Sequence, residues 1–393
     1  MAENYRFHCP VKIVSGTSAL EKLPGEFRQL NAKRPIIVTD PGVAGAGLLD
    51  IIKTAFDGSD VEIAYTYDQV PADSPLSSVL KIVDLFEQNS CDSFLAIGGG
   101  SAIDTTKAAN VKVSAKEIDL MNFKAVLRAT IDTKPFIAIP TTAGTGSEVT
   151  SAAVISDPEQ GIKLSLLNPR IPPDVAIIDP RMTASLPPIL TATTGMDALT
   201  HAIEAFVGIQ KNPISDAYAS SAVRLIGQNL VKVVKDGQNL EARMAMANAA
   251  TMAGIAFSNS MVGMVHALGH ASGAVCHIPH GAAMSLFLAD TLEFNLEMIG
   301  EDLGDLLIDL AGLEETAATP VEQRAIRVIE IIQEMRRQLN ELCHLPLTLK
   351  AAGVTEDKLA EIAKVSVTDG AAYYNRKKFD ETDAMTVIRK VFE

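Results

Sequence analysis

Cysteine is scarce in this sequence and nowhere forms a paired motif. The four cysteines stand at positions 9, 91, 276 and 343, far apart and without a C-x-x-C pair. This spacing argues against a disulfide framework and against a cysteine-based zinc site. We therefore expect reduced thiols and a cytoplasmic protein.

Basic residues are also in short supply. The sequence has 34 lysines and arginines against 48 aspartates and glutamates, which gives a formal net charge of -14. A basic stripe that could neutralise phosphate groups is missing, so binding to nucleic acid or to an anionic membrane is disfavoured. This charge balance leaves a small molecule as the expected partner.

Long apolar runs, repeats and low-complexity tracts are absent as well. No stretch has the length of a membrane-spanning helix, and the first residues lack a basic flank followed by an apolar core, so we expect neither insertion nor export. No period of about 20 to 50 residues recurs, which excludes a solenoid. The composition, with 47% apolar and 21% charged residues, is typical of a globular enzyme. A length of 393 residues indicates two domains.

The pattern of apolar residues changes at about residue 186. Before it, short apolar runs alternate with turn signals and amphipathic stretches, which predicts an α/β domain over residues 1–186 with a mainly parallel sheet. A cluster of prolines over residues 169–188 predicts extended chain at the boundary. After it, helical spacing predicts an all-α domain over residues 187–393. The predicted strands are 35–39, 61–67, 94–97, 136–139 and 175–178, and the clearest helices are 189–208, 213–235, 241–258 and 319–342.

A glycine turn at Gly98, Gly99, Gly100 and Ser101 joins a predicted strand to the start of a predicted helix. Glycines let the backbone approach a pyrophosphate closely, and the free N–H groups and dipole of a helix start favour negative charge. The spacing differs from the G-x-G-x-x-G fingerprint, so an ordinary tight turn stays open as the alternative. Other residues must decide whether a dinucleotide binds here.

A second loop, residues 140–148, also follows an apolar strand and combines Thr141, Thr142 and Thr145 with two glycines. Two such loops can hold one cofactor. Asp40 ends another predicted strand, where a carboxylate can accept hydrogen bonds from a ribose and repel a 2′-phosphate. This favours NAD(H) over NADP(H), although an ordinary turn residue or helix cap is the alternative for Asp40.

Histidines gather in the helical half. Four of the seven fall within fifteen residues of one another. Asp197 and His201 are four residues apart, which places both on one face of a helix, and His266 and His270 have the same spacing. His280 follows in a turn. Neutral imidazoles and a carboxylate suit Fe(II), Zn, Ni or Co rather than calcium or magnesium. The sequence thus predicts a transition-metal site, and it leaves the metal and the role of His270 open.

Together these motifs resemble the iron-containing (group III) alcohol dehydrogenases, along nearly the whole chain. The resemblance rests on the glycine turn with Asp104, the 140–148 loop, the Asp197 and His201 pair, the His266 and His270 pair, and the sequence I-P-H-G at 278–281.

The resemblance implies a Rossmann-like N-terminal domain that binds NAD(H) and a helical C-terminal domain that binds the metal. His270 would lie beside the reacting carbonyl rather than on the ion, and we expect a homo-oligomer. Fe(II) is the expected metal, with Zn(II) or another divalent transition metal as the alternative. The implied metal ligands are Asp197, His201, His266 and His280. The implied cofactor contacts are Asp40, Gly98, Gly99, Gly100, Ser101, Asp104, Thr141, Thr142, Thr145 and Lys163, the last on the resemblance alone.

We therefore expect a metal-dependent oxidoreductase that transfers a hydride between NAD(H) and a small primary alcohol or diol, or its aldehyde. A metal with an open position would polarise the carbonyl, and His270 would relay the proton. Phe257 and Val262 are candidates for the apolar wall of the pocket. Two alternatives stay open: a zinc-dependent glycerol dehydrogenase or dehydroquinate-synthase-like enzyme, and a non-catalytic metal- and nucleotide-binding protein.

Overall fold

The computed structural model describes residues 4–157 and 162–393, apart from the side chains of residues 123–125, 162 and 163. These described residues divide into two compact units. An α/β unit contains Cys9–Thr142 and Gly146–Ser185, and a helical unit contains the described residues up to His8, Ala143–Thr145 and Leu186–Glu393. This division confirms the predicted fold class, an α/β part followed by an all-helical part.

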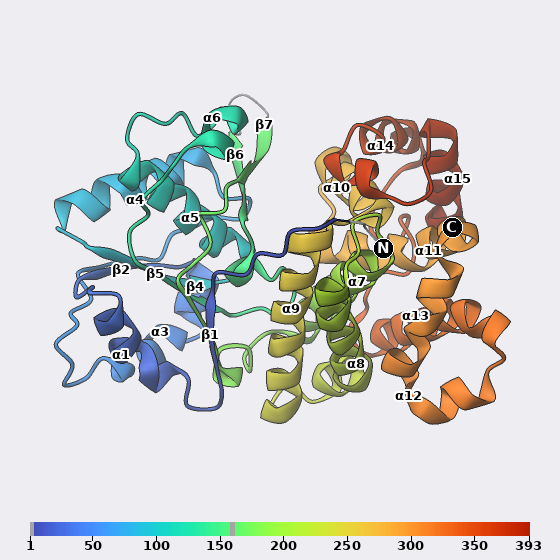
Figure 1. Cartoon of the computed structure of the whole chain (residues 1–393), viewed down its shortest axis with the longest axis horizontal. Coiled ribbons are helices and arrows are strands. Elements are labelled where there is room, and N and C mark those ends of the chain that lie inside the picture. Colours follow the sequence, from blue (N-terminus) through green and yellow to red (C-terminus); the bar gives the residue numbers. More distant parts are fainter. Residues whose placement is uncertain (1–3, 158–161) are drawn as a thin grey trace. The chain divides into compact units, whose positions relative to one another are not determined.

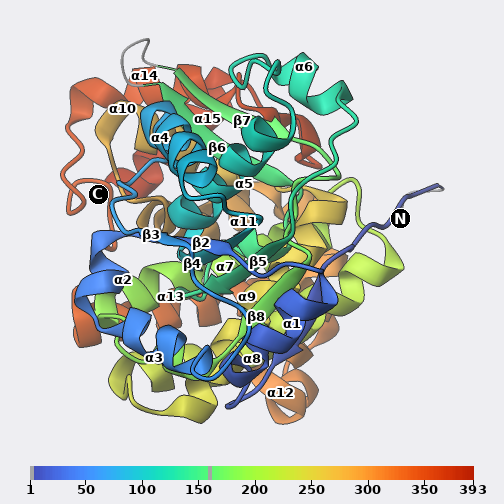
Figure 2. The same ribbon diagram turned by 90° about the vertical axis from the view of Figure 1, so that its left-hand side faces the viewer.

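Within the described residues, six strands of the α/β unit form one parallel sheet in the order β1-β8-β5-β4-β2-β3. Figure 2 shows β3, β2, β4, β5 and β8 following one another across the sheet. The strands of this sheet are β1 (Lys12–Ser15), β2 (Pro35–Val38), β3 (Tyr65–Tyr67), β4 (Ser93–Gly98), β5 (Phe136–Pro140) and β8 (Val175–Ile178). A separate antiparallel pair consists of β6 (Ala152–Asp157) and β7 (Ile162–Leu167). Each of the five predicted strands overlaps a strand of the parallel sheet, although the predicted strand 61–67 is a strand only over Tyr65–Tyr67. Strands β1, β6 and β7 were not predicted.

Helices cover both faces of this sheet, which explains why β2, β4, β5 and β8 are buried along their whole length. Successive side chains of a strand point to opposite faces. Phe94 and Ala96 therefore pack with α4 and α5, while Leu95 and Ile97 pack with α1, α2 and α3. Figure 1 shows α4 and α5 on one side of the sheet and α1 and α3 on the other. The helices of this unit are α1 (Leu23–Gln29), α2 (Pro41–Gly45), α3 (Leu48–Ala55), α4 (Leu76–Gln88), α5 (Gly100–Ser114) and α6 (Phe123–Arg128).

The direction in which successive strands are added to the sheet reverses between β2 and β4. From β2 the chain continues to β3 at one edge, and then returns to β4 on the other side of β2, from which β5 and β8 follow. In open parallel sheets, ligands bind outside the carboxyl ends of the strands where the order reverses in this way. The residues after β2 and β4, which include Asp40 and the glycine turn, are therefore in the position where a ligand is expected.

The helical unit is arranged around α7 (Pro188–Val207), which packs against α8, α9, α11 and α13. Both α7 and α8 have proline at their first helical residue, where a missing N–H costs no hydrogen bond. No helix among the described residues combines the length and apolar character needed to cross a membrane. The other helices of this unit are α8 (Pro213–Lys235), α9 (Leu240–Ser260), α10 (Met264–Cys276), α11 (His280–Asp305), α12 (Leu307–Ala318), α13 (Arg324–Cys343), α14 (Leu359–Ser366) and α15 (Glu381–Phe392). The short 3-10 helices of the chain are η1 (Leu20–Lys22), η2 (Ser147–Val149), η3 (Pro180–Met182), η4 (Val321–Gln323), η5 (Glu356–Lys358) and η6 (Gly370–Tyr374).

Candidate metal and cofactor sites

Four side chains of the helical unit bring ligand atoms together. Asp197 and His201 come from successive turns of α7, His266 comes from α10, and His280 is the first residue of α11. One ligand atom from each residue lies within 4.8 Å of all the others, and all but His280 are buried. The four residues that the sequence implied as metal ligands are therefore neighbours in the structure. His280, which we expected in a turn, instead begins a helix directly after Pro279.

The electrostatics of this cluster suit a cation. Nδ1 of His201 and Nε2 of His266 are buried and have no hydrogen-bond partner among the described residues. An unpaired buried polar atom costs about 1–3 kcal/mol, so two of them in one cluster are expected where an ion binds. Oδ1 of Asp197 lies 3.2 Å from Nε2 of His280. One carboxylate and three imidazoles form a donor set that fits a divalent transition metal.

The protonation states of the cluster agree with this fit. Burial lowers the pKa of His201 to about 3 and the pKa of His266 well below its ordinary value, so both imidazoles are neutral at pH 7. Burial alone would raise the pKa of Asp197, but His201 and His280 bring it below its usual range. Metal ligands must be deprotonated to bind, and these groups already are.

Glu204 supports the cluster from behind. One carboxylate oxygen lies 2.5 Å from Nδ1 of His266, and the other accepts a hydrogen bond from the backbone N–H of Val265 at 2.7 Å. Burial raises the pKa of Glu204 to about 7. A carboxylate on one ring nitrogen of histidine orients the ring and leaves the other nitrogen for a metal. Sequence reasoning gave Glu204 no role, although Asp197, His201 and Glu204 share one helical face by their spacing.

His270 lies one turn beyond His266 and differs from the four clustered residues in exposure and partner. Its side chain is 43% exposed, and its ring centroid lies 5.6 Å from that of His266 and 5.4 Å from that of His280. Nδ1 of His270 is 3.0 Å from Oδ2 of Asp369. Sequence reasoning missed Asp369, because 99 residues separate the two partners. An apolar neighbour is also present, since Phe257 stacks on His201 with centroids 4.2 Å apart.

In the α/β unit, the glycine turn connects the end of β4 to the start of α5. Gly98 has φ +156°, and a Cβ there would lie 2.6 Å from Cβ of Ala102, so only glycine fits without a shift. A Cβ on Gly99 would lie 3.3 Å from the Thr142 side chain, and the backbone N–H of Thr141 donates to the carbonyl of Gly98 at 3.1 Å. The two predicted loops are therefore adjacent. Gly100 and Ser101 begin α5, where the first N–H groups lack intrahelical acceptors.

Asp40 lies beside this turn and also caps a helix. One carboxylate oxygen accepts hydrogen bonds from the backbone N–H groups of Gly42 at 2.9 Å and Val43 at 3.0 Å, at the start of α2. The other oxygen lies 3.2 Å from the position that a Cβ on Gly98 would occupy. The capping role that the sequence left open is thus present, and the carboxylate still borders the glycine turn.

A buried network ties the second loop to α5. The carboxylate of Asp104 accepts hydrogen bonds from the Ser147 hydroxyl at 2.5 Å and from the backbone N–H of Val154 at 2.9 Å. The fully buried Lys107 donates to the hydroxyls of Ser147 at 3.0 Å and Thr150 at 2.9 Å. Burial lowers the pKa of Lys107. Asp104 and Lys107 therefore hold the second loop against α5 by hydrogen bonds. Sequence reasoning did not identify Lys107.

Two other residues implied as cofactor contacts stand apart from these. Thr145 belongs to the short segment Ala143–Thr145 that groups with the helical unit. In that segment, a Cβ on Gly144 would lie 2.7 Å from Cβ of Thr194, so these three residues approach α7 closely. Lys163 lies in β7, and its side chain is outside the described part of the chain.

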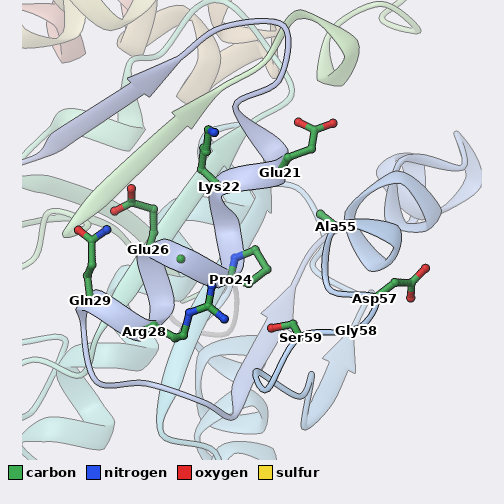
Figure 3. Close-up of a pocket in the computed structure, with 11 residues that line it drawn as sticks. Glu21, Lys22, Pro24, Glu26, Arg28, Gln29, Ala55, Asp57, Gly58 and Ser59 are labelled. Atoms are coloured by element: carbon green, nitrogen blue, oxygen red, sulfur yellow. The ribbon is translucent and has the colours of Figure 1, made fainter.

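A surface pocket of about 410 Å³ lies elsewhere in the α/β unit, next to α1 and the end of α3 (Figure 3). Its lining includes Glu21, Lys22, Arg28 and Asp57, with charges of both signs. None of the described residues predicted to bind a cofactor or a metal lines it. We therefore do not assign it to the reaction.

Comparison with known proteins covers most of the chain. A family model described as "Iron-containing alcohol dehydrogenase" matches residues 10–180, and one described as "Fe-containing alcohol dehydrogenase family, C-terminal" matches residues 191–392. The chain is 34% identical to the NAD-dependent methanol dehydrogenase of Bacillus methanolicus over 98% of both chains.

Solved structures show the same likeness. A 1,3-propanediol oxidoreductase matches with a TM-score of 0.94 at 31% identity, over 99% of this chain and all of its own. The sulfoacetaldehyde reductase of Bifidobacterium kashiwanohense, solved in complex with NAD+, matches with a TM-score of 0.86 at 26% identity over 99% of both chains. The chain therefore belongs to the iron-containing alcohol dehydrogenase family, and the predicted oxidoreductase function is favoured over the lyase and non-catalytic alternatives.

Proposed function

We propose that this member of the iron-containing alcohol dehydrogenase family interconverts small primary alcohols or diols and their aldehydes with NAD(H) and a divalent metal. The observation that carries this proposal is the cluster of Asp197, His201, His266 and His280, in which two buried imidazole nitrogens face no hydrogen-bond partner among the described residues. A non-catalytic binding protein would gain nothing from the further, exposed imidazole of His270 beside that cluster.

The metal ligands are Asp197, His201, His266 and His280, with Glu204 orienting His266. Fe(II) is the first candidate because of the family, and the donor set also suits Zn(II). When bound, the metal supplies Lewis acidity toward an alcohol or carbonyl oxygen, and NAD(H) supplies or accepts the hydride. The α7 helix contributes two ligands one turn apart, so its rigidity holds part of the cluster in place.

The cofactor binds at the carboxyl ends of β2, β4 and β5. Backbone N–H groups of Gly99, Gly100 and Ser101 at the start of α5 bind the pyrophosphate, and hydroxyls of the second loop, Thr141, Thr142 and Thr145, add hydrogen bonds. Asp40 accepts a hydrogen bond from the ribose and repels a 2′-phosphate, which selects NAD(H). Lys163 is assigned to the ribose on the family resemblance. Asp104, on α5, holds the second loop by accepting a hydrogen bond from the Ser147 hydroxyl.

The proton of the alcohol passes through His270. Its side chain is exposed, and it lies next to His266 and His280 without sharing the burial of the cluster. In alcohol oxidation, Nε2 of His270 takes the hydroxyl proton, and in aldehyde reduction it returns it. Phe257, stacked on His201, excludes water from one side of the reacting group and favours a short apolar chain in the substrate.

We also propose a cytoplasmic homo-oligomer. All four cysteines are free in the described part of the chain, which supports a reducing compartment. Strand β1 lies at the edge of the sheet with Ile13 40% exposed, and an edge strand can pair with a second copy.

The test is anaerobic turnover with controlled metal content. Chelator-stripped protein is compared with protein reloaded with Fe(II) or Zn(II), using NADH with short aldehydes and NAD+ with methanol and 1,3-propanediol, the alcohols named in two relatives. We expect activity that depends on the metal and that is lost in His266→Ala but kept in His8→Gln, a control at an exposed histidine. Binding of metal and NADH without turnover of any alcohol or aldehyde would overturn the proposal.

A further inference from the structure

The contact between His270 and Asp369 has a geometry that constrains both residues. Asp369 follows α14 and caps η6, because Oδ1 accepts a hydrogen bond from the backbone N–H of Ala371 at 2.8 Å. Oδ2 lies 3.0 Å from Nδ1 of His270. Since each oxygen has its own partner, the carboxylate cannot rotate without losing one of them. Asp369 is thus held in place by the backbone of η6 while it faces the imidazole.

A carboxylate lies at Nδ1 of two histidines on α10. His266 has the Glu204 carboxylate at Nδ1, and His270, one turn later, has the Asp369 carboxylate at Nδ1. The two histidines have different roles because their side chains differ in exposure to solvent. The His266 side chain is 3% exposed and its Nε2 belongs to the buried cluster, whereas the His270 side chain is 43% exposed. A carboxylate at Nδ1 accepts a hydrogen bond, so it selects the tautomer that carries its hydrogen on Nδ1.

We propose that Asp369 is a positioning residue that fixes His270 in the Nδ1–H tautomer and leaves the lone pair of Nε2 to receive the proton of the alcohol. The inference rests on the proposed function. In the oxidation, the O–H bond of the alcohol breaks and its proton goes to Nε2. The C–H bond breaks with its electron pair, the hydride reduces NAD+ to NADH, and the alcohol carbon is oxidised to a carbonyl. Aldehyde reduction runs these transfers in reverse.

The substitution Asp369→Asn tests this with little change in shape. The amide oxygen of asparagine can still accept from the Ala371 N–H, but its NH2 group then faces Nδ1 of His270 and favours the hydrogen on Nε2, where it blocks proton acceptance. The matched control is Asp380→Asn. Asp380 also caps a helix, by accepting from the N–H groups of Thr382 and Asp383, and its loss removes the same charge away from His270.

In metal-loaded enzyme, we expect Asp369→Asn to lower kcat for alcohol oxidation by about a hundredfold or more, in line with loss of acid–base assistance. The KM for the alcohol, the Kd for NADH, the metal content and the Tm should remain close to those of the unchanged protein, as should every property of Asp380→Asn. An unchanged kcat in Asp369→Asn, or an equal loss in Asp380→Asn, would overturn the proposal.

A second readout is independent of turnover. ¹⁵N NMR of histidine in zinc-loaded protein distinguishes an imidazole with its hydrogen on Nδ1 from one with its hydrogen on Nε2, and His270→Gln identifies the resonances of His270. We expect Nδ1–H in the unchanged protein and Nε2–H in Asp369→Asn. Nε2–H in the unchanged protein would overturn the inference even if Asp369→Asn does not fold. Lack of turnover by the unchanged enzyme would instead overturn the proposed function and leave the tautomer to be decided by NMR.

Discussion

The two units of this protein form their candidate sites from different parts of the chain. In the helical unit, four side chains from α7, α10 and α11 converge, and buried ring nitrogens are left without partners among the described residues. In the α/β unit, the candidate site is mainly backbone: a glycine turn and the start of α5. A side-chain site can be altered one atom at a time while the fold persists. A backbone site can be altered only by changing the path of the chain.

The largest expected effect comes from removing one metal ligand. His266→Ala should lower kcat/KM by on the order of a thousandfold or more, because Lewis-acid stabilisation of several kcal/mol is lost. NADH affinity, measured by fluorescence titration, should remain unchanged, because no residue of the glycine turn is touched. A parallel loss of NADH affinity would contradict the assignment of cofactor binding to residues other than the metal ligands.

The next largest effect is expected on metal affinity, from a change at Glu204, which contacts the ligand His266. Glu204→Gln should weaken metal affinity by about tenfold to a hundredfold, because the amide orients His266 less well than the carboxylate does. The measurement is a competition titration with a chelator. Glu301→Gln, at an exposed position of α11, is the control and should bind metal as the unchanged protein does.

A smaller effect is expected at the glycine turn. Gly98→Ala places a Cβ 2.6 Å from Cβ of Ala102 at a φ that alanine rarely adopts, so the turn must shift. Strain of about 1–3 kcal/mol predicts a loss of NADH affinity of about tenfold, with metal affinity unchanged. Gly45→Ala, where an added Cβ meets no atom within 4 Å, is the matched control. Equal NADH affinities in the two variants would show that the turn does not bind the cofactor.

The smallest effect is the pH dependence of stability in metal-stripped protein. His201 has its pKa lowered to about 3 in the folded state, and that of His266 is lowered as well, so the unfolded chain takes up their protons first as the pH falls below about 6.5. Their contribution to stability is present above that pH and is lost toward pH 3. Glu204, with a pKa raised to about 7, acts in the opposite sense, since its contribution is lost as the pH rises through 7.

We therefore expect the Tm of stripped protein to fall by a few degrees between about pH 7.5 and about pH 5.5, because two imidazoles outweigh one carboxyl. Glu204→Gln removes the opposing group, so its Tm should fall more steeply over the same range. A Tm that rises between these pH values would mean that the imidazoles are not held neutral by burial.

The same contrast between side chains and backbone explains what the sequence could predict. Continuous apolar runs identified the buried strands, and helical spacing identified α7, α8, α9 and α13. Strand β1 was missed because its residues Lys12–Ser15 are largely exposed at the sheet edge and show no apolar run. Strand β6 was missed because the small side chains of Ala152 and Ala153 give a weak strand signal.

The candidate site residues could likewise be predicted only where a local sequence pattern indicates them. Asp197, His201, His266 and His280 could be proposed from spacing, since helical geometry places residues four apart on one face. Asp369 could not, because only tertiary packing brings it to His270. Lys107 could not either, because a lysine in an amphipathic stretch is ordinarily solvated, and here it is fully buried among hydroxyls.

The measurement that tests the central claim most directly is anomalous diffraction at the iron absorption edge, from crystals of enzyme loaded anaerobically with Fe(II). We predict one strong peak per chain within bonding distance of Asp197, His201, His266 and His280, with His270 outside the coordination sphere. A peak that lacks these four ligands, or one bonded to His270 in place of His280, would contradict the account.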